Sequence, residues 1–428
     1  MYSSLANKKA KLAVIGLGYT GLPLVLAFAK NFSVIGFDIN KSVIAQLSNR
    51  KDPNGELEEA DFSNTDIYFT ADDDDLQAAS FFIVTVPTPI TPAKEPDLSL
   101  LKNAMATIGC YLSKGDYIVI ESTVYPGCTE EYCVPILEAV SGLSAGIDFK
   151  IGYSPERINP GDKTHGIQNV VKLVAGNDAE AVEEIKKVYS SIVKAGVNAV
   201  STIKVAEAAK MLENIQRDLN IALANEMAIV FDKLKINSAE VIEAAATKWN
   251  FQKFVPGLAG GHCIAVDPYY LLHKADAMGV EMPLVKTARQ VNEGMIGYVT
   301  NVVLSHLATM KKELAQSRVL VKGIAFKANV ADVRNSRIIE VINSLIQHGV
   351  VVEVEDPIAD SELLTSEYGV NLTNTTGPFD VIIISVAHDA YLHLDDSYFA
   401  SITNDDALVV DLKGIYQNKI INRKYRSL

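Results

Sequence analysis

The sequence predicts an α/β fold in which two Rossmann-like, doubly wound domains are joined by a central domain of long helices. Short apolar runs rich in β-branched residues alternate with helix-like segments at both ends of the chain, a pattern typical of parallel α/β sheets. Between these regions the pattern is helical with few breakers. A G-x-G-x-x-G motif follows the first apolar run. We therefore place the domains at 1–200, 201–314 and 315–428.

The size and composition of the chain narrow the class of protein. A chain of 428 residues is too long for a single core. Its net charge of −13 disfavours a nucleic-acid binder, which needs an exposed basic surface. The first residues lack an apolar signal core, and no apolar run reaches membrane-spanning length. We therefore expect a cytoplasmic protein that binds neither nucleic acid nor membrane.

The four cysteines predict no metal site. Cys128 and Cys133 are five residues apart, and neither a second pair nor a histidine cluster accompanies them. In a reducing compartment these thiols stay free, which leaves a catalytic role open for one of them.

The glycine motif stands in the context that a dinucleotide site requires. A buried strand is expected at 11–16, the motif occupies 16–21, and a helix-like segment follows at 22–30. A second strand at 33–38 then ends in an acid, Asp38. Strand, glycine motif, helix, strand and acid together form the dinucleotide fingerprint.

Each residue of this fingerprint has a physical role. Gly16 makes the tight turn, Gly18 lets the pyrophosphate approach, and Gly21 lets the helix pack on the strand. The helix N-terminus offers free N–H groups and partial positive charge to the phosphates. Asp38 can accept hydrogen bonds from the ribose hydroxyls and repels a 2′-phosphate. The fingerprint therefore predicts NAD rather than NADP.

Hydroxyl side chains follow two further buried strands. Thr88 comes after the run at 81–86, and Thr123 comes after the run that begins at Tyr117. Ligands of open α/β sheets bind beyond the carboxyl ends of the strands. We therefore expect both threonines to face the nicotinamide half of the cleft.

Two charged segments of the first domain allow more than one interpretation. Glu156 and Arg157 lie on a Pro/Gly-rich loop after another strand, either as a solvated turn or as part of a site. The run Asp72 to Asp75 is interpreted as a solvated loop or a helix start.

A polar stripe marks the helix expected from Ile203 to about Leu234. Lys210, Asn214 and Arg217 are spaced i, i+4 and i+7, which places them on one face. This stripe is either a solvated face or a face that binds an anion and an alcohol.

The segment from Gly257 to Tyr270 carries the most reactive side chain. Gly257, Gly260 and Gly261 permit close backbone approach or positive φ. Cys263 would then be presented on a tight loop, where its thiolate could act as a nucleophile, with Asp267 four residues later. The alternative is a glycine-rich turn around a buried structural cysteine.

The last third of the chain is a second alternating α/β region without G-x-G-x-x-G. Its expected strands begin near Arg318, Val350, Phe379 and Ala407. Lys327 and Arg334 follow the first of these strands and could hold a second nucleotide-like ligand there.

Seven motifs in order give the chain a resemblance to a known family. They are G-x-G-Y-x-G, Val-Pro-Thr-Pro, Glu-Ser-Thr, Ser-Pro-Glu-Arg, Lys-x-x-x-Asn-x-x-Arg, Gly-Gly-His-Cys-Ile-x-Val-Asp-Pro-Tyr-Tyr and Ala-Phe-Lys-x-x-x-x-Asp-x-Arg-x-Ser. The chain resembles the nucleotide-sugar 6-dehydrogenases, the UDP-glucose and GDP-mannose dehydrogenase superfamily, over nearly its whole length. The resemblance implies an NAD-binding first domain, a central dimerisation domain with the nucleophile loop, and a third domain that binds the UDP-sugar.

The resemblance also implies a four-electron oxidation of a primary alcohol to a carboxylate with two NAD+, through a thiohemiacetal and a thioester on Cys263. Lys210 and Asn214 would stabilise oxyanions, Asp267 and Lys210 would hold a water that Thr123 orders, and Glu156 is the candidate base. The implied cofactor contacts are Gly16, Gly18, Tyr19, Thr20, Gly21, Asp38, Thr88, Thr123 and Arg334. The implied substrate contacts are Glu156, Arg157, Ile158, Lys210, Asn214, Arg217, Gly257, Gly260 and Lys327.

The substrate is narrowed further by the motif around the cysteine, which is similar to the branch that acts on UDP-N-acetyl sugars. The manno-specific members usually carry an Arg in the stretch where Thr247 and Trp249 stand. This departure argues against the manno sugar and does not choose between the gluco and galacto sugars. We expect UDP-N-acetylglucosamine, with UDP-N-acetylgalactosamine or UDP-N-acetylmannosamine as alternatives. The resemblance also implies a homodimer and a role in surface-polysaccharide synthesis. A two-electron hydroxyacid-type dehydrogenase is a more remote alternative. A non-catalytic NAD sensor is disfavoured because it needs no nucleophile.

Overall fold

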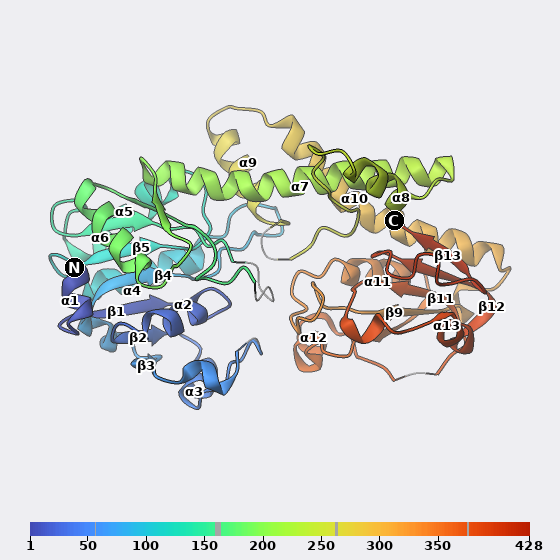
Figure 1. The fold of residues 1–428 in the computed structure, drawn as a ribbon, viewed down its shortest axis with the longest axis horizontal. Helices are drawn as coiled ribbons and strands as arrows, with labels where there is room; N and C mark the ends of the chain where they lie inside the picture. Colours follow the sequence, from blue (N-terminus) through green and yellow to red (C-terminus); the bar gives the residue numbers. More distant parts are fainter. Residues whose placement is uncertain (56, 159–163, 262–263, 375) are drawn as a thin grey trace. The chain divides into compact units, whose positions relative to one another are not determined.

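The computed structural model describes residues 1–55, 57–158, 164–261, 264–374 and 376–428. The chain forms two compact units. The first comprises Met1–Glu213 and Tyr269–Glu281, and the second comprises Asn214–Pro268 and Met282–Leu428. Figure 1 colours the chain from blue at residue 1 to red at residue 428, so most of the first unit is blue to green and most of the second is yellow to red.

The first unit is built on one eight-stranded sheet with the order β3-β2-β1-β4-β5-β6-β7-β8. All neighbouring strands are parallel except β6 and β7. The order reverses between β1 and β4, which is the switch point where doubly wound sheets bind ligands. The strands are β1 (Lys11–Ile15), β2 (Val34–Phe37), β3 (Ile67–Thr70), β4 (Ala79–Val84), β5 (Tyr117–Ile120), β6 (Lys150–Tyr153), β7 (Lys172–Gly176) and β8 (Val197–Ala199).

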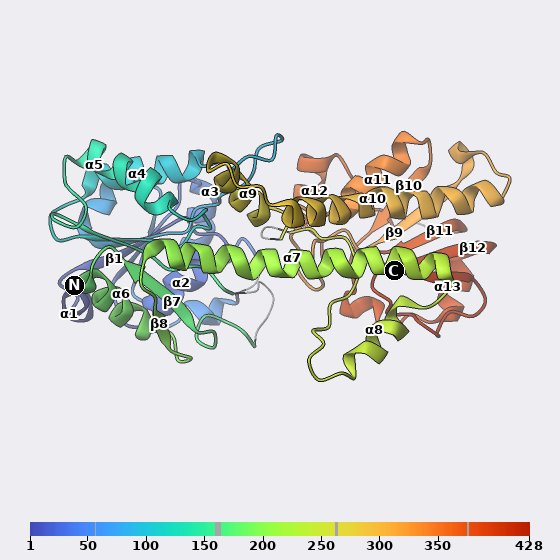
Figure 2. The same cartoon turned by 90° about the horizontal axis from the view of Figure 1, so that it is seen from above.

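Helices cover both faces of this sheet (Figure 2). One core joins the sheet to α1 (Tyr2–Ala6), α2 (Gly21–Phe28) and α6 (Ala179–Ser190), with Phe28 and Tyr189 packed edge to face. A second core on the other face joins it to α4 (Ser99–Tyr111) and α5 (Val134–Ser141). The inner strands β1, β2, β4 and β5 are almost entirely apolar because they are buried on both faces, whereas the edge strands β3 and β8 are partly exposed. A short helix, α3 (Lys41–Ser48), follows β2.

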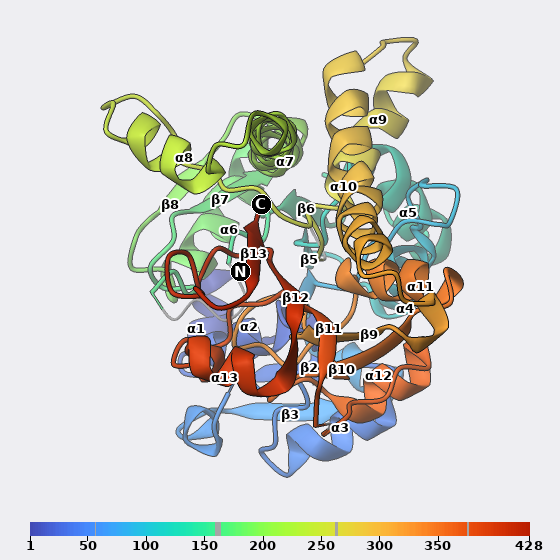
Figure 3. The same ribbon diagram turned by 90° about the vertical axis from the view of Figure 1, so that its right-hand side faces the viewer.

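The second unit is built on a five-stranded parallel sheet with the order β10-β9-β11-β12-β13. Figure 3 shows α11 and α13 on opposite sides of these strands. One core packs α10, α11 and α12 against the sheet, and a smaller core packs α13 against it through Phe379, Phe399 and Tyr416. The elements are β9 (Arg318–Lys322), β10 (Val351–Glu355), β11 (Phe379–Ile384), β12 (Thr403–Asp411), β13 (Lys424–Ser427), α10 (Pro283–Thr309), α11 (Ile338–Gln347), α12 (Ser361–Tyr368) and α13 (Asp396–Ile402).

The middle of the chain is helical. The longest helix, α7, spans Ile203–Leu234, and α8 (Ser238–Ala246) and α9 (Asp267–Ala277) follow it. Asn237 caps α8 by accepting a hydrogen bond from the Glu240 amide. The predicted class, two parallel α/β sheets with a long central helix, is confirmed. No helix among the described residues combines the length and apolarity needed to cross a bilayer.

Candidate cofactor and catalytic sites

The glycines of the turn between β1 and α2 have different surroundings. One faces open space, and the other two lie against protein backbone. Gly16 has a φ of +93°, which strains residues with a side chain. A Cβ on Gly21 would lie 1.8 Å from the Gly16 carbonyl oxygen, so α2 can pack this closely only on a glycine. A Cβ on Gly18 would meet no protein atom within 4 Å. The turn therefore has the open cradle that a pyrophosphate requires.

Asp38 lies beside this turn, at the end of β2. Its Oδ2 accepts a hydrogen bond from the Leu17 amide at 2.9 Å, and its Oδ1 accepts one from the Asn40 amide at 2.9 Å. The structure thus brings together the turn and the acid that the sequence predicts. It also adds Thr85, whose hydroxyl donates to the Gly16 carbonyl at 2.7 Å and ties the end of β4 to the turn.

The other predicted cofactor residues of the first unit are also near strand ends. Tyr19 and Thr20 are half-buried in the turn before α2. The Thr88 hydroxyl donates to the Thr123 carbonyl at 2.7 Å, so the two predicted threonines are neighbours. This contact fastens the segment after β4 to the segment after β5.

Lys210 and Glu156 meet in the first unit. The ammonium group of Lys210, which is buried, donates to the Glu156 carbonyl oxygen at 2.6 Å. The Glu156 carboxylate accepts a hydrogen bond from the Ile158 amide. Its other oxygen lies 3.9 Å from the Lys172 ammonium group. Lys210, predicted as catalytic, therefore contacts the backbone of Glu156, the predicted base, whose carboxyl group lies near Lys172 instead.

Arg157 is half-buried and is held by two contacts with the protein. Its guanidinium group pairs with Glu213 on α7, with an Nη2–Oε1 distance of 2.7 Å, and donates to the Val171 carbonyl at 2.7 Å. These two contacts orient the guanidinium group inside the unit, while the side chain stays 27% exposed, so both interpretations of this residue remain predictions.

Asn214 and Asp267 meet in the second unit. The Asn214 amide group donates to the Asp267 carboxylate, and both side chains are buried. Arg217 is exposed on the same helix. Cys263, the predicted nucleophile, lies outside the described residues.

The glycines before Cys263 serve close backbone packing. Gly261 has a φ of +88°, and its amide donates to the Asn335 carbonyl at 3.1 Å. A Cβ on Gly260 would lie 2.7 Å from the same carbonyl oxygen. Gly257 is bonded through both backbone groups to the side chain of Asn225. The predicted positive φ is therefore confirmed at Gly261, whereas the close approach at Gly260 is to protein backbone rather than to a ligand.

A pocket in the second unit adjoins this glycine segment and carries cations that the sequence analysis missed. Its lining includes Gly260, Phe326, Ser336, Arg337, Ser385 and Lys413. Arg337 and Lys413 both lie in the lining, so an anion here would meet two positively charged side chains. Lys413 follows the predicted strand directly, and that position at a strand end was the available signal.

The two cations predicted in this unit lie on the loop after β9. Lys327 is half-buried. Arg334 forms a two-point ion pair with the buried Asp332, with Nε–Oδ1 at 2.9 Å and Nη2–Oδ2 at 2.8 Å. Asp332 therefore fixes the direction of the Arg334 side chain.

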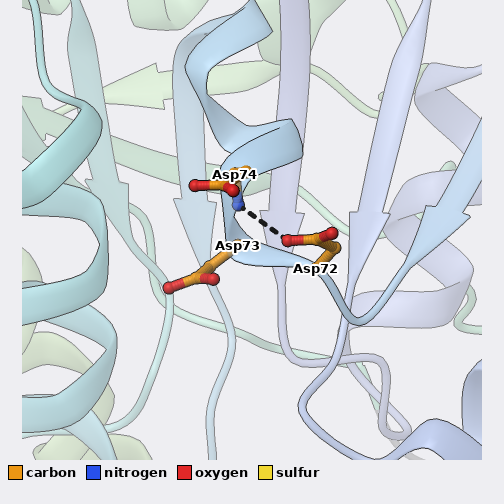
Figure 4. Close-up of side chains that lie close together, drawn as sticks. All are labelled: Asp72, Asp73 and Asp74. Atoms are coloured by element: carbon orange, nitrogen blue, oxygen red, sulfur yellow. Dashed lines mark hydrogen bonds between the residues drawn. The ribbon is translucent and has the colours of Figure 1, made fainter.

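The aspartate run is a helix start, as one of its two interpretations predicts. Asp72 caps the 3₁₀ helix at Asp73–Ala78 and accepts a hydrogen bond from the Asp74 amide at 3.2 Å (Figure 4). The ligand atoms of Asp72, Asp73 and Asp74 lie within 4.8 Å of one another, and all three residues are exposed. Carboxylates this exposed are satisfied by water, so their proximity does not indicate a metal site.

Comparison with known proteins matches three domain profiles of one family, the UDP-glucose/GDP-mannose dehydrogenase family. Its NAD-binding domain matches residues 10–193, its central domain 204–294 and its UDP-binding domain 320–418. The chain is 45% identical to the protein CapL of Staphylococcus aureus, over 97% of this chain and 98% of that protein. It is 44% identical to a UDP-N-acetyl-D-glucosamine 6-dehydrogenase of Pseudomonas aeruginosa, over 95% and 97%.

A solved structure agrees with the fold at lower identity. It is a UDP-D-ManNAc dehydrogenase from Pyrococcus horikoshii, with a TM-score of 0.89, 28% identity, and coverage of 97% of this chain and 98% of that one.

Proposed function

Because this chain belongs to the UDP-glucose/GDP-mannose dehydrogenase family of NAD-dependent oxidoreductases, we propose that it oxidises the C6 alcohol of UDP-N-acetylglucosamine to a carboxylate. The observation that carries the choice of sugar is the 44% identity to a relative named for that substrate, against 32% to a relative named for the manno epimer. Thr247 and Trp249 stand where manno-specific members usually have an Arg, which argues against the manno epimer but does not separate the gluco and galacto sugars.

The cofactor is held by the turn after β1. The pyrophosphate would lie against Gly18 and accept hydrogen bonds from the N–H groups at the N-terminus of α2. Asp38 would accept hydrogen bonds from the ribose hydroxyls. Thr88 and Thr123 line the nicotinamide end, and Arg334 is the further cofactor contact that family membership suggests. When bound, NAD+ accepts a hydride from C6 in each of the two oxidations.

Cys263 makes the second oxidation feasible. A free aldehyde has no C–H and O–H pair that can be lost together. The thiolate adds to the aldehyde carbon, the carbonyl oxygen takes up a proton, and a thiohemiacetal forms with a new C–S bond. Loss of the remaining C6 hydride and the hydroxyl proton then gives a thioester. Lys210 and Asn214 stabilise the oxyanion at each stage.

Hydrolysis completes the reaction. Asp267 and Lys210 hold a water molecule that Thr123 orders, and Glu156 takes its proton. The water oxygen forms a bond to the acyl carbon, the C–S bond breaks, and the thiolate of Cys263 is restored. The products are the UDP-uronate and two NADH. The Asn214–Asp267 hydrogen bond supports this role because it fixes the direction of the carboxylate.

The second-unit pocket is proposed to take the UDP group. Arg337 and Lys413 supply positive charge to its diphosphate. Family membership suggests further substrate contacts at Glu156, Arg157, Ile158, Arg217, Gly257, Gly260 and Lys327.

We also propose a homodimer built on the central helices, and a role in making a surface polysaccharide such as a capsule.

The test is to count NADH against sugar consumed with UDP-GlcNAc, UDP-GalNAc, UDP-ManNAc and UDP-Glc separately. We expect a ratio near two and the highest kcat/KM with UDP-GlcNAc. The Cys263→Ala variant should no longer form the carboxylate. A ratio near one, or carboxylate produced without the cysteine, would contradict the mechanism, and preference for another epimer would contradict the choice of sugar.

A further inference from the structure

A buried polar stripe runs along α7 within the second unit. It consists of Asn214, Asp218 and Asn225, which lie on one face at positions i, i+4 and i+11. All three are at most 9% exposed, on a helix whose other buried residues are largely apolar. Asn214 contacts Asp267, as described above, but the proposed chemistry leaves Asp218 and Asn225 without a role.

Asn225 binds the backbone at the start of the glycine segment. Its Oδ1 accepts from the Gly257 amide at 2.7 Å, and its Nδ2 donates to the Gly257 carbonyl at 3.0 Å. The same Nδ2 donates to Asn292 on α10 at 2.8 Å. One side chain thus satisfies both backbone groups of one residue, which fixes the position and direction of the chain there.

Asp218 acts on the other side of the cysteine, through Arg289 of α10. The Arg289 Nη1 lies 2.5 Å from Asp218 Oδ1, and both side chains are at most 3% exposed. The same nitrogen donates to the carbonyl of Ile264, the residue after Cys263, at 3.4 Å. Asn292 completes the network by donating to Asp218 Oδ1 at 2.7 Å.

Stability alone does not account for this network. Replacing a buried ion pair with apolar residues of similar volume is often neutral or stabilising, because burial of the charges costs about as much as their attraction returns. The hydrogen bonds of these polar groups instead fix the orientation of the backbone that they bind. They bind the segment at Gly257, Ile264 and Asp267, so α7 holds it both before and after Cys263.

We propose that Asn225 and Arg289 are positioning residues for Cys263, fixing the backbone on either side of it so that the thiol and Asp267 act on the same carbon. This inference rests on the proposed function. The first oxidation, from alcohol to aldehyde, makes no bond to sulfur. The second requires sulfur at the aldehyde carbon, and a displacement of about 1 Å can cost on the order of a hundredfold in rate.

The two oxidations can be separated in a single-turnover experiment with enzyme in excess over UDP-GlcNAc, followed by NADH absorbance. In Asn225→Ala and Arg289→Lys we expect the first NADH to form within about threefold of the wild-type rate, and the second to slow by roughly a hundredfold. Arg289→Lys keeps a cation beside Asp218, so it tests the contact to Ile264 without leaving a buried charge unpaired.

The matched control is Val409→Ala, which removes apolar packing from the smaller core of the same unit, a core that includes no residue of the segment. It should lower the melting temperature and leave the ratio of the two phases unchanged. Equal slowing of both phases in Asn225→Ala and Arg289→Lys, or two unaffected phases, would overturn the positioning role. Cys263→Ala tests the proposed function separately from the positioning role. If this variant loses only the second NADH, the proposed function holds, whatever the result for Asn225→Ala and Arg289→Lys.

Discussion

Gly18 and Gly21 are glycines for different reasons, and the difference predicts opposite effects of the same substitution. Gly18→Ala places a methyl group where the protein leaves open space. The variant should keep its melting temperature and lose roughly tenfold to a hundredfold in NAD affinity, because only the bound pyrophosphate meets the methyl group. Isothermal titration with NAD and a thermal melt of the free protein measure the two quantities.

Gly21→Ala is the matched comparison. Its methyl group would meet the Gly16 carbonyl oxygen and the Thr85 hydroxyl, so the free protein itself should lose about 1–3 kcal/mol of stability as α2 moves off the sheet. Equal melting temperatures for the two variants would contradict this account of the turn.

The sequence predicts the site role of some residues and not of others. Gly16 and Asp38 stand at fixed spacings inside a local pattern, so their neighbourhood could be predicted. Thr85, Asn225 and Lys413 belong to no such pattern. Their partners lie far away in the chain, as with Thr85 and Gly16, and only the folded topology brings them together.

The first turns of α7 are anchored by a buried acid, Glu207. Its carboxylate accepts hydrogen bonds from the amides of Gly127 at 2.5 Å and Thr129 at 2.9 Å. Burial raises the pKa of Glu207 from 4.5 to about 7, although these amides oppose the shift. A carboxyl group whose pKa is raised by folding stabilises the fold below its unfolded pKa, and this contribution is lost as the pH rises through its folded pKa.

We therefore expect the wild-type protein to lose stability relative to Glu207→Gln between about pH 4.5 and pH 7, by up to about 1.4 kcal/mol per pH unit. Chemical denaturation of both proteins across this range measures the difference in their free energies of unfolding. A constant difference, or one that changes in the opposite direction, would show that Glu207 does not titrate as its burial requires.

Helices and strands were more predictable than their contacts. The apolar runs that predict β1, β4 and β9 have a physical reason to be uniform, because parallel strands are buried on both faces. The spacing of Lys210, Asn214 and Arg217 places them on one helix, as α7 shows. It could not show that Lys210 contacts Glu156, that Asn214 contacts Asp267 and that Arg217 is exposed, because these differences depend on which segments pack against each turn.

The proposed homodimer makes a prediction for the whole molecule. Leu212, Leu223 and Leu234 of α7 are 68%, 57% and 62% exposed. They recur every 11 residues, which is close to three helical turns and places them along one side of the helix. Apolar side chains aligned in this way favour contact with another surface, and a second copy of α7 presents the same leucines.

Leu223→Glu would place two carboxylates in the apolar contact, one from each copy, where neither has a counter-charge. We expect the wild-type protein to have about twice the 46.4 kDa chain mass in size-exclusion chromatography with light scattering, and Leu223→Glu to have the mass of one chain. Ile421→Glu is the matched control, since Ile421 is 81% exposed and lies outside α7; it should stay dimeric. A wild-type monomer would refute the homodimer, whereas a dimeric Leu223→Glu protein would place the contact on a surface other than this side of α7.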